Sequence, residues 1–343
     1  TQLEEFLKNP SLKYDYTQFD GNAEGFRILT KLQYLGDLEG LNLTFATLSS
    51  ILKYPNYNEG NKQHNRIGNH KHGTFYTEKD ILDKIMNGCG LKTEKGFIRH
   101  PLAFLMEAAD SICYLIMDIE DANQKQWLTL ENLKMYIERS TNISSEVKNK
   151  LIKNTQTTSG QNNYSKKEWV SFRTTLLSHL MEVATKNFVE NLNNIIIGEY
   201  NKELIEDNDG VAQSLQKISR EYILSNREIT SLEITGEAVV SGILNAYIKY
   251  FFHTNKAFRN RGKSLISRSI FMTILHEHKE TYKDDMDFQQ KYKNYQSIEE
   301  LYNAFDIADF TVEERFRLIR DFIACMTDKF ALNHIQKLNG QKI

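Results

Sequence analysis

Cysteine and proline are both scarce in this chain of 343 residues. Its three cysteines, Cys89, Cys113 and Cys325, lie far apart and lack the spacing of a metal site. So sparse and odd a set of thiols argues against a disulfide framework and favours a reducing compartment, so we expect a cytoplasmic protein. The chain also has three prolines. Because proline interrupts helices, the long proline-free segments favour an all-α fold.

Long apolar runs and an excess of one charge are also missing. No stretch approaches the roughly 20 apolar residues that span a bilayer, so we expect no membrane partner. Residues 1–9 mix acids with apolar side chains and do not resemble a signal peptide. The formal net charge of −2 gives no global basic field for nucleic acid. A polyanionic ligand would therefore have to be held by local cations.

Hydrophobic periodicity predicts helices through most of the sequence. We expect them at 22–36, at 43–54 with Asn42 as the N-cap, at 101–122, and at about 165–197, 211–224, 236–253 and 312–338. Pro101 occupies the first-turn position that proline favours. Residues 56–74 and the run from Asn154 to Asn163 are expected to be loops, and the patch from Glu228 to Ile234 is a candidate extended segment. With no internal repeat or low-complexity linker, we expect a single helical unit.

The segment 101–122 holds the most informative pattern. Asp110, Tyr114 and Asp118 are spaced by four residues and share one face of the expected helix. The rest of the segment is apolar almost all round, which is typical of a helix inside a core. Carboxylates there are costly unless they are paired, hydrogen-bonded or bound to a metal. The pattern alone does not choose between a functional site and two acids paired with buried arginines.

Several stretches, in order, resemble the bacterial dGTPases of the metal-dependent HD superfamily. They are FDGNAEGFRIL at 19–29, GLNLTFATLSSILKYP at 40–55, HGTFYTEKD at 72–80, RHPLAFLMEAADSICYLIMDIEDA at 99–122 and RDFIACMTDKFAL at 320–332. The resemblance spans nearly the whole chain and is less specific for which nucleotide is cleaved. It implies an HD-superfamily helical fold, with 1–140 forming the rest of the HD core and 141–343 a helical C-terminal region.

The resemblance implies hydrolysis of a deoxynucleoside triphosphate (dNTP) to the deoxynucleoside and triphosphate, by water attack at the α-phosphorus. It also implies a divalent cation, Mg²⁺ or Mn²⁺, which would polarise phosphoryl oxygens and activate water. Asp110 matches the last aspartate of the family's H…HD…D metal site. No His-Asp dipeptide occurs in the sequence, and in the family these ligands precede the stretch that begins here at residue 19. We therefore expect the histidine ligands and the proton-transfer groups upstream of this sequence, and no catalytic residue within it.

Two further residues on the same helix face match sugar-binding positions of the family. Tyr114 matches the tyrosine that lies against the deoxyribose and leaves no room for a 2′-hydroxyl. Asp118 matches the acid that accepts a hydrogen bond from the 3′-hydroxyl. The family usually carries a second acid after the ligand aspartate, where this chain has Ser111. Because that neighbour faces about 100° away on the helix, we expect it to have little effect on the metal.

Four more residues match positions near the substrate. Lys53 and Lys71 are the candidates for holding the triphosphate, against the plainer interpretation of solvated surface lysines. Asn22 matches a position near the substrate, although a simple helix N-cap would look the same in sequence. Arg320 belongs to the last matching stretch and is a candidate contact to the base.

Two other patterns are weaker. His276 and His278 flank Glu277, but a spacing of two residues points them to different helix sides, so we expect no metal site there. A basic run with one aromatic residue could bind phosphate or single-stranded nucleic acid, although a solvated or subunit-contacting face is favoured; it consists of Lys256, Phe258, Arg259, Arg261, Lys263 and Arg268.

The leading hypothesis is therefore a dNTP triphosphohydrolase, which the resemblance implies to be a homo-oligomer. One alternative is a catalytically inactive HD-fold protein that is regulatory or binds single-stranded nucleic acid. The missing ligands favour that alternative if the chain is complete, whereas the retained Asp110, Tyr114 and Asp118 argue against it. A second alternative is an HD-type phosphohydrolase that acts on other nucleotides.

Overall fold

The computed structural model describes residues 8–33, 40–57, 67–94, 96–153, 166–206 and 210–341. It is 73% helical, which confirms the all-α fold. Among the described residues the one sheet is a small antiparallel pair, β1 (Lys92–Thr93) and β2 (Gly96–Phe97). None of the described helices has the length and apolarity needed to cross a membrane.

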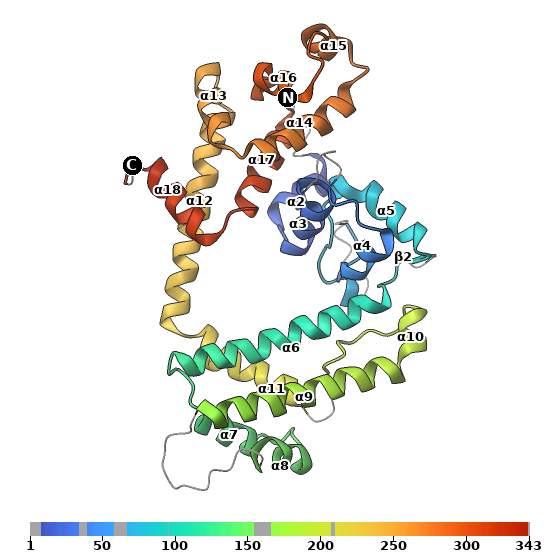
Figure 1. Cartoon of the computed structure of the whole chain (residues 1–343), viewed down its shortest axis with the longest axis vertical. Helices are drawn as coiled ribbons and strands as arrows, with labels where there is room; N and C mark the ends of the chain where they lie inside the picture. Colours follow the sequence, from blue (N-terminus) through green and yellow to red (C-terminus); the bar gives the residue numbers. More distant parts are fainter. Residues whose placement is uncertain are drawn as a thin grey trace.

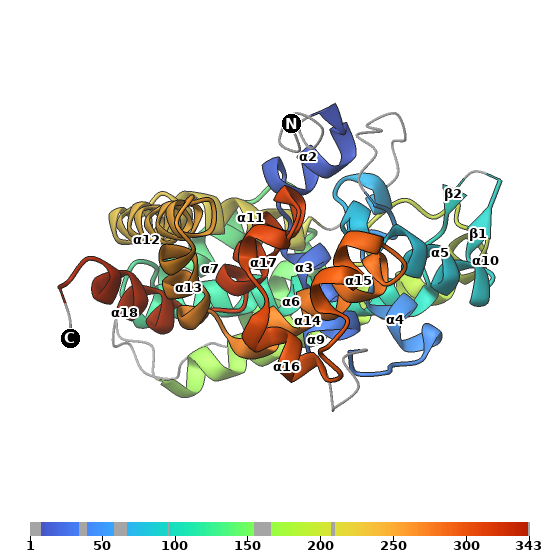
Figure 2. The ribbon, with the colours of Figure 1, turned by 90° about the horizontal axis from the view of Figure 1, so that it is seen from above.

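Figures 1 and 2 show how the helices are arranged. Their buried apolar side chains form three hydrophobic cores. The first part of the chain contains α2 (Pro10–Thr17), α3 (Gly21–Arg27), the π-helical η1 (Ile28–Leu32), α4 (Phe45–Ile51), η2 (Ile67–Asn69), η3 (Tyr76–Glu78) and α5 (Lys79–Gly88). Its core joins Phe26 of α3, Leu48 of α4 and Leu82 of α5.

The second core lies under the long helix α6 (Pro101–Gln124). Around it pack α7 (Leu130–Arg139), α8 (Ser145–Lys153), α9 (Lys166–Glu190), α10 (Leu192–Ile196), α11 (Val211–Ile218) and the π-helical η4 (Ser219–Leu224). This core contains Ile137 and Ile143, which lie on either side of residue 140. Hydrophobic packing therefore marks no boundary between 1–140 and 141–343.

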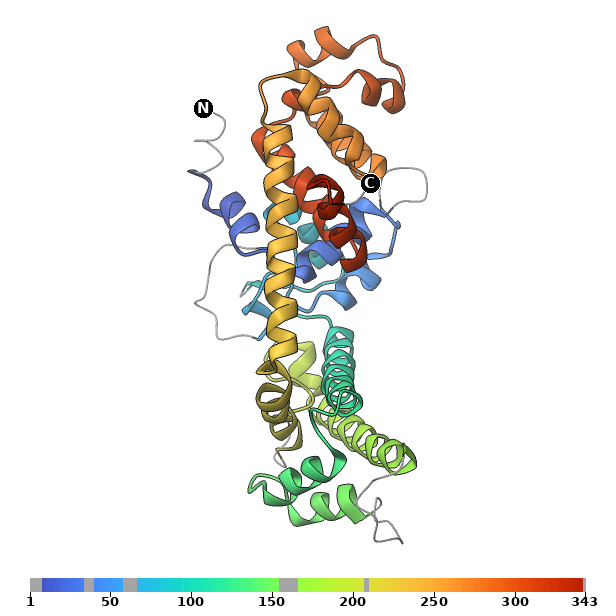
Figure 3. The same cartoon turned by 90° about the vertical axis from the view of Figure 1, so that its left-hand side faces the viewer.

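The third core is built by the last part of the chain, with Leu32 of η1 added from the first. Its elements are α12 (Arg227–Phe251), α13 (Lys256–Leu265), α14 (Arg268–Tyr282), α15 (Met286–Tyr292), α16 (Ile298–Ala304), η5 (Ile307–Asp309), α17 (Val312–Ala324) and α18 (Asp328–Leu338). Figure 3 shows α12 as a long straight helix that connects the α6 region to this core.

Helix α6 confirms the clearest sequence prediction, since it begins at Pro101 and His100 caps it by accepting from the amide of Leu102 at 3.1 Å. Two other predictions need correction. The N-cap of α4 is Thr44, because Asn42 adopts a positive φ of 50°. The patch 228–234 is not extended but lies in α12, whose cap Asn226 accepts from the amide of Glu228.

The expected helix at 312–338 is two helices. Its pattern continues across the break, but Thr327 caps a new helix by accepting from the amide of Phe330. Between 256 and 304, α13 to α16 were not predicted, and α7 and α8 occupy a segment that reads as polar. Positions 34–36 of the first expected helix, much of the expected loop at 56–74 and the run from Asn154 to Asn163 lie outside the described residues.

Candidate functional site

A cleft of about 490 Å³ collects side chains from five separate parts of the chain. Four of the residues predicted from sequence line it together: Lys53, Lys71, Asp110 and Tyr114. The other lining residues are Ser111 and Leu115 of α6, Glu203 of the segment after α10, and Gln216, Ser219, Arg220 and Leu224 of α11 and η4. Two lysines and an arginine thus face a helix that carries an exposed carboxylate.

Helix α6 presents its polar face to this cleft rather than to a core. The side chain of Asp110 is 71% exposed and Tyr114 is 57% exposed, so the expectation of buried acids is wrong for Asp110. The apolar side of α6 is buried on the opposite face, for example at Ile112 and Ile119. The acid of this helix that does pair with a buried arginine is Glu107, which accepts from Arg99 Nη2 at 2.7 Å.

Asp118 continues the face of Asp110 and Tyr114 by one more turn. Ser219 of η4 donates to its Oδ2 at 3.2 Å, and Tyr114 also hydrogen-bonds to it. Burial raises the pKa of Asp118 although both hydrogen bonds oppose the shift, and the charge of Asp118 raises the pKa of Tyr114. The two side chains therefore form one hydrogen-bonded unit, held against the wall that η4 supplies.

Lys53 follows the end of α4 and points toward α6. Its Nζ lies 3.6 Å from Oε1 of Glu107 and 3.8 Å from Oδ2 of Asp110, and its side chain is 17% exposed. This half-buried position between two carboxylates is not that of a solvated surface lysine. The ammonium group is fixed at the rim of the cleft by charge on two sides.

Gly73 allows the second lysine to approach the first. A Cβ atom at position 73 would lie 2.1 Å from the carbonyl oxygen of Tyr54, so only glycine permits the two backbones to pack so closely. Asn56 fastens the same contact, since its Nδ2 donates to the carbonyl of Lys71 at 2.8 Å. The segment after α4 and the segment before η3 are thereby joined at the cleft.

Lys71 itself lies 3.5 Å from Oδ2 of Asp20, with its side chain 57% exposed. Asp20, not Asn22, is the N-cap of α3, and Asn22 Nδ2 donates to it at 2.6 Å. Burial would raise the pKa of Asp20, but the hydrogen bonds from Asn22 and the charge of Lys71 lower it. Asn22 lines an adjoining cavity of about 380 Å³, which shares Lys53 with the cleft.

Arg320 is not among the residues that line the cleft. It is 8% exposed, stacks on the ring of Phe75 at 3.7 Å and donates to Asp321 Oδ1 at 2.8 Å. It belongs to a buried group of charges around Arg27, where burial and the charge of Asp321 raise the pKa of Glu24 to about 7. A contact between Arg320 and the base remains a prediction that this position does not support.

Sequence reasoning missed the wall of the cleft opposite Lys53. Gln216 and Arg220 are spaced by one helical turn and both face the cleft, while Ser111 donates to Glu203 at 3.2 Å. Burial and the nearby charge of Glu107 raise the pKa of Glu203. The helix at 211–224 was expected, but nothing local in it indicates that it packs against α6.

The described residues do not by themselves fit a divalent cation. A metal site needs a group of three or more His, Cys, Asp or Glu side chains, and the described residues contain no such group. Asp110 is exposed and has a lysine beside it. At the other candidate, His278 bonds to Glu314 at 2.9 Å, whereas Glu277 pairs with Arg27.

The basic run is largely used inside the fold. Arg259 is 9% exposed and donates to Asp306 from Nε at 2.7 Å, and Lys263 donates to the carbonyls of Tyr302 and Phe305. Of the rest, Arg268 pairs with Glu299 at 3.2 Å. Arg259 and Lys263 therefore hold neighbouring segments of the fold together, which weakens the case for a nucleic-acid-binding surface here.

Three known proteins with similar sequences are named as a deoxyguanosinetriphosphate triphosphohydrolase or as a protein like one. The chain is 30% identical over 343 residues to a deoxyguanosinetriphosphate triphosphohydrolase-like protein of Listeria monocytogenes, covering 97% of this chain and 68% of that protein. It is 28% identical to the deoxyguanosinetriphosphate triphosphohydrolase of Cronobacter sakazakii, covering 96% of this chain and 65% of that one. A triphosphohydrolase-like protein of Pseudomonas aeruginosa is 32% identical over 72% of this chain and 56% of its own length. No protein-family model matches.

Proposed function

This chain belongs to the deoxyguanosinetriphosphate triphosphohydrolase family, and we propose that its cleft binds a dNTP for hydrolysis to the deoxynucleoside and triphosphate. The observation that carries the proposal is the convergence of Lys53, Lys71 and Arg220 on the face that bears Asp110 and Tyr114. A volume of about 490 Å³ lies within the range that small-molecule sites occupy.

The three cations of the cleft suit a triphosphate. Lys53 and Lys71 approach from the segments joined at Gly73, and Arg220 faces the cleft from η4. A guanidinium group can bind two phosphate oxygens at once, while ammonium groups act as point charges. Lys53 would exchange part of its contact with Asp110 for a phosphate oxygen.

The α6 side of the cleft suits the sugar. The exposed ring of Tyr114 offers a flat surface, and Asp118 is an acceptor that Ser219 already orients. A deoxyribose packed on the ring would place its 3′-hydroxyl toward Asp118 and would leave no space for a 2′-hydroxyl. The sugar would then be recognised by Tyr114 and Asp118 of α6, and the phosphates by Lys53, Lys71 and Arg220 from the segments around that helix.

In the reaction, the oxygen of water bonds to the α-phosphorus, the bond from that phosphorus to O5′ breaks, and O5′ takes up a proton. The residues described here bind and orient the substrate for this in-line attack, which is a large part of phosphoryl-transfer catalysis. Since they do not form a metal site, we assign them substrate recognition and assign no chemical step to a cation.

Calorimetric titration of the protein with dGTP, deoxyguanosine and inorganic triphosphate, in a chelating buffer, tests the proposal. We expect saturable dGTP binding that is weakened by Arg220→Ala and by Asp118→Ala. Arg220→Ala should weaken triphosphate binding without affecting deoxyguanosine, and Asp118→Ala should do the reverse. No dGTP binding, or binding that neither substitution alters, would show that the cleft is not the substrate site.

A further inference from the structure

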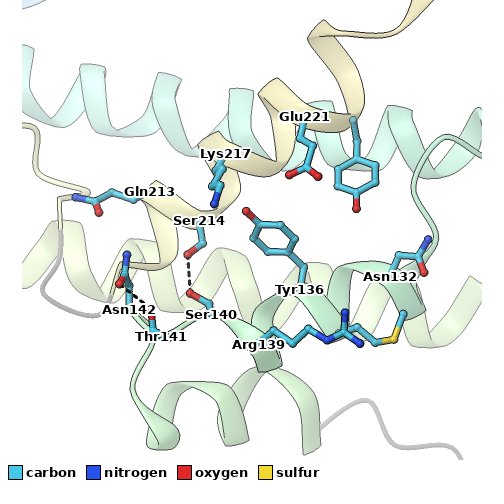
Figure 4. Close-up of a pocket in the computed structure, with 12 residues that line it drawn as sticks. Asn132, Tyr136, Arg139, Ser140, Thr141, Asn142, Gln213, Ser214, Lys217 and Glu221 are labelled. Atoms are coloured by element: carbon cyan, nitrogen blue, oxygen red, sulfur yellow. Dashed lines mark hydrogen bonds between the residues drawn. The ribbon is translucent and has the colours of Figure 1, made fainter.

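A second cavity, of about 700 Å³, lies between α7 and the α11–η4 segment (Figure 4). It shares no lining residue with the cleft that contains Asp110. One wall is formed by α7 and the turn after it, and the other by α11 and η4. The two walls are tied by a hydrogen bond of 3.3 Å between the hydroxyls of Ser140 and Ser214.

Two cations face this cavity from opposite walls. Figure 4 shows Lys217 on the α11 wall and Arg139 at the end of α7. Within the described part of the chain, neither side chain has a hydrogen bond or an ion pair. One carboxylate, Glu221, also lines the cavity, so its lining charge is positive overall. An arginine and a lysine that have no partner in the described part of the chain are both suited to bind phosphate oxygens.

The same cavity is lined by two tyrosines and by side-chain amides. Tyr136 and Tyr222 are half-buried, and among the described residues their hydroxyls have no hydrogen-bond partner. Asn132 and Gln213 lie at the edges of the cavity, where their amides can both donate and accept. Tyrosine rings offer flat surfaces on which a planar heterocycle can stack.

We propose that this cavity binds a small nucleoside phosphate. Arg139 and Lys217 would hold the phosphate, the ring of Tyr136 would stack on the base, and the amides would read its edge. The volume of about 700 Å³ is ample for a mononucleotide. This assignment stands apart from the proposed function, because it rests on a different set of side chains.

The α11–η4 segment separates the two sites in a way that an experiment can use. Gln213 and Lys217 face the second cavity, whereas Gln216 and Arg220 face the cleft. The residues of each pair are one helical turn apart. A cation can therefore be removed from either face of the same segment, and the two substitutions serve as controls for each other. Lys217→Ala and Arg220→Ala each remove one exposed cation from the same segment.

The test is titration of the protein with AMP, GMP, CMP and UMP, with adenosine and inorganic phosphate as separate arms. These ribonucleotides carry the 2′-hydroxyl that the cleft is proposed to exclude. We expect at least one monophosphate to bind about tenfold more tightly than either adenosine or phosphate. Arg139→Ala and Lys217→Ala should each weaken its binding by about tenfold or more, as loss of a charge-assisted hydrogen bond implies. Tyr136→Ala should weaken the monophosphate and adenosine but not phosphate.

Arg220→Ala and the distant, exposed Lys186→Ala are the controls, and both should leave this binding unchanged. Four results would overturn the proposal. The first is that no monophosphate shows saturable binding at millimolar concentration, and the second is that inorganic phosphate binds as tightly as the monophosphates. The third is that neither Arg139→Ala nor Lys217→Ala changes the binding. The fourth is that a single-stranded oligonucleotide binds while no mononucleotide does.

Discussion

Lys53→Met removes the ammonium group that lies between two carboxylates while keeping most of the apolar stem. The Nζ atom is 3.6 Å from Glu107 and 3.8 Å from Asp110, so it stands at the rim of the cleft where a phosphate would enter. A charge-assisted hydrogen bond contributes about 1.5–3 kcal/mol. The dissociation constants of dGTP and of triphosphate should therefore rise by roughly 10- to 150-fold. Deoxyguanosine, which carries no phosphate, should bind as before.

The fold should survive this substitution. Glu107 keeps its 2.7 Å contact with Arg99, so its buried charge is not left alone. Calorimetry with dGTP, triphosphate and deoxyguanosine measures the effect, and Lys249→Met on the exposed side of α12 is the matched control. If Lys53→Met binds triphosphate as tightly as the unsubstituted protein, Lys53 does not contact the phosphates.

Three further predictions concern the fold and turnover. Arg27→Met leaves the buried carboxylates of Glu78 and Asp321 without the guanidinium that lies 2.7 Å from each. Urea denaturation should show that the free energy of unfolding falls by about 3–5 kcal/mol. Arg173→Met removes a more exposed ion pair and should lower it by about 1 kcal/mol or less, and equal losses would refute this difference. Burial raises the pKa of Asp15 from 3.8 to about 7, so its contribution to stability is fully present below pH 4 and is lost as the pH rises through 7. The free energy of unfolding should therefore fall by roughly 1–3 kcal/mol more between pH 5 and 8 than it does in Asp15→Asn, and parallel pH profiles would contradict this. Because the described residues form no cluster of three metal ligands, residues 1–343 alone should show no dNTP turnover with Mg²⁺ or Mn²⁺, and robust metal-dependent turnover would refute that expectation.

The sequence was most informative where a local signal and a family match coincide. Pro101 and the apolar periodicity predicted the start and approximate length of α6. The family resemblance pointed to Lys53 and Lys71, which line the same cleft as Asp110. Gly73 shows why such stretches are informative, since its missing side chain is what allows two of them to meet.

Contacts between segments that are far apart in the chain could not be predicted from the sequence. An apolar helix such as α6 does not reveal which of its faces a neighbour will cover, so Asp110 was expected in a core and lies exposed. Likewise, Arg220 and Glu203 reach the cleft only because η4 and the segment after α10 pack against α6. Arg27 is a further case, because its partners lie 51 and 294 residues away in the chain.

The central claim, that the cleft recognises a deoxyribonucleoside triphosphate, is tested most directly by comparing the affinities of dGTP and GTP. If the ring of Tyr114 excludes the 2′-hydroxyl, the protein should bind dGTP about ten- to a hundredfold more tightly than GTP. Tyr114→Ala should abolish that preference, and Tyr114→Phe, which keeps the ring, should retain it. Equal affinity for dGTP and GTP in the unsubstituted protein, or a preference that survives in Tyr114→Ala, would contradict the account.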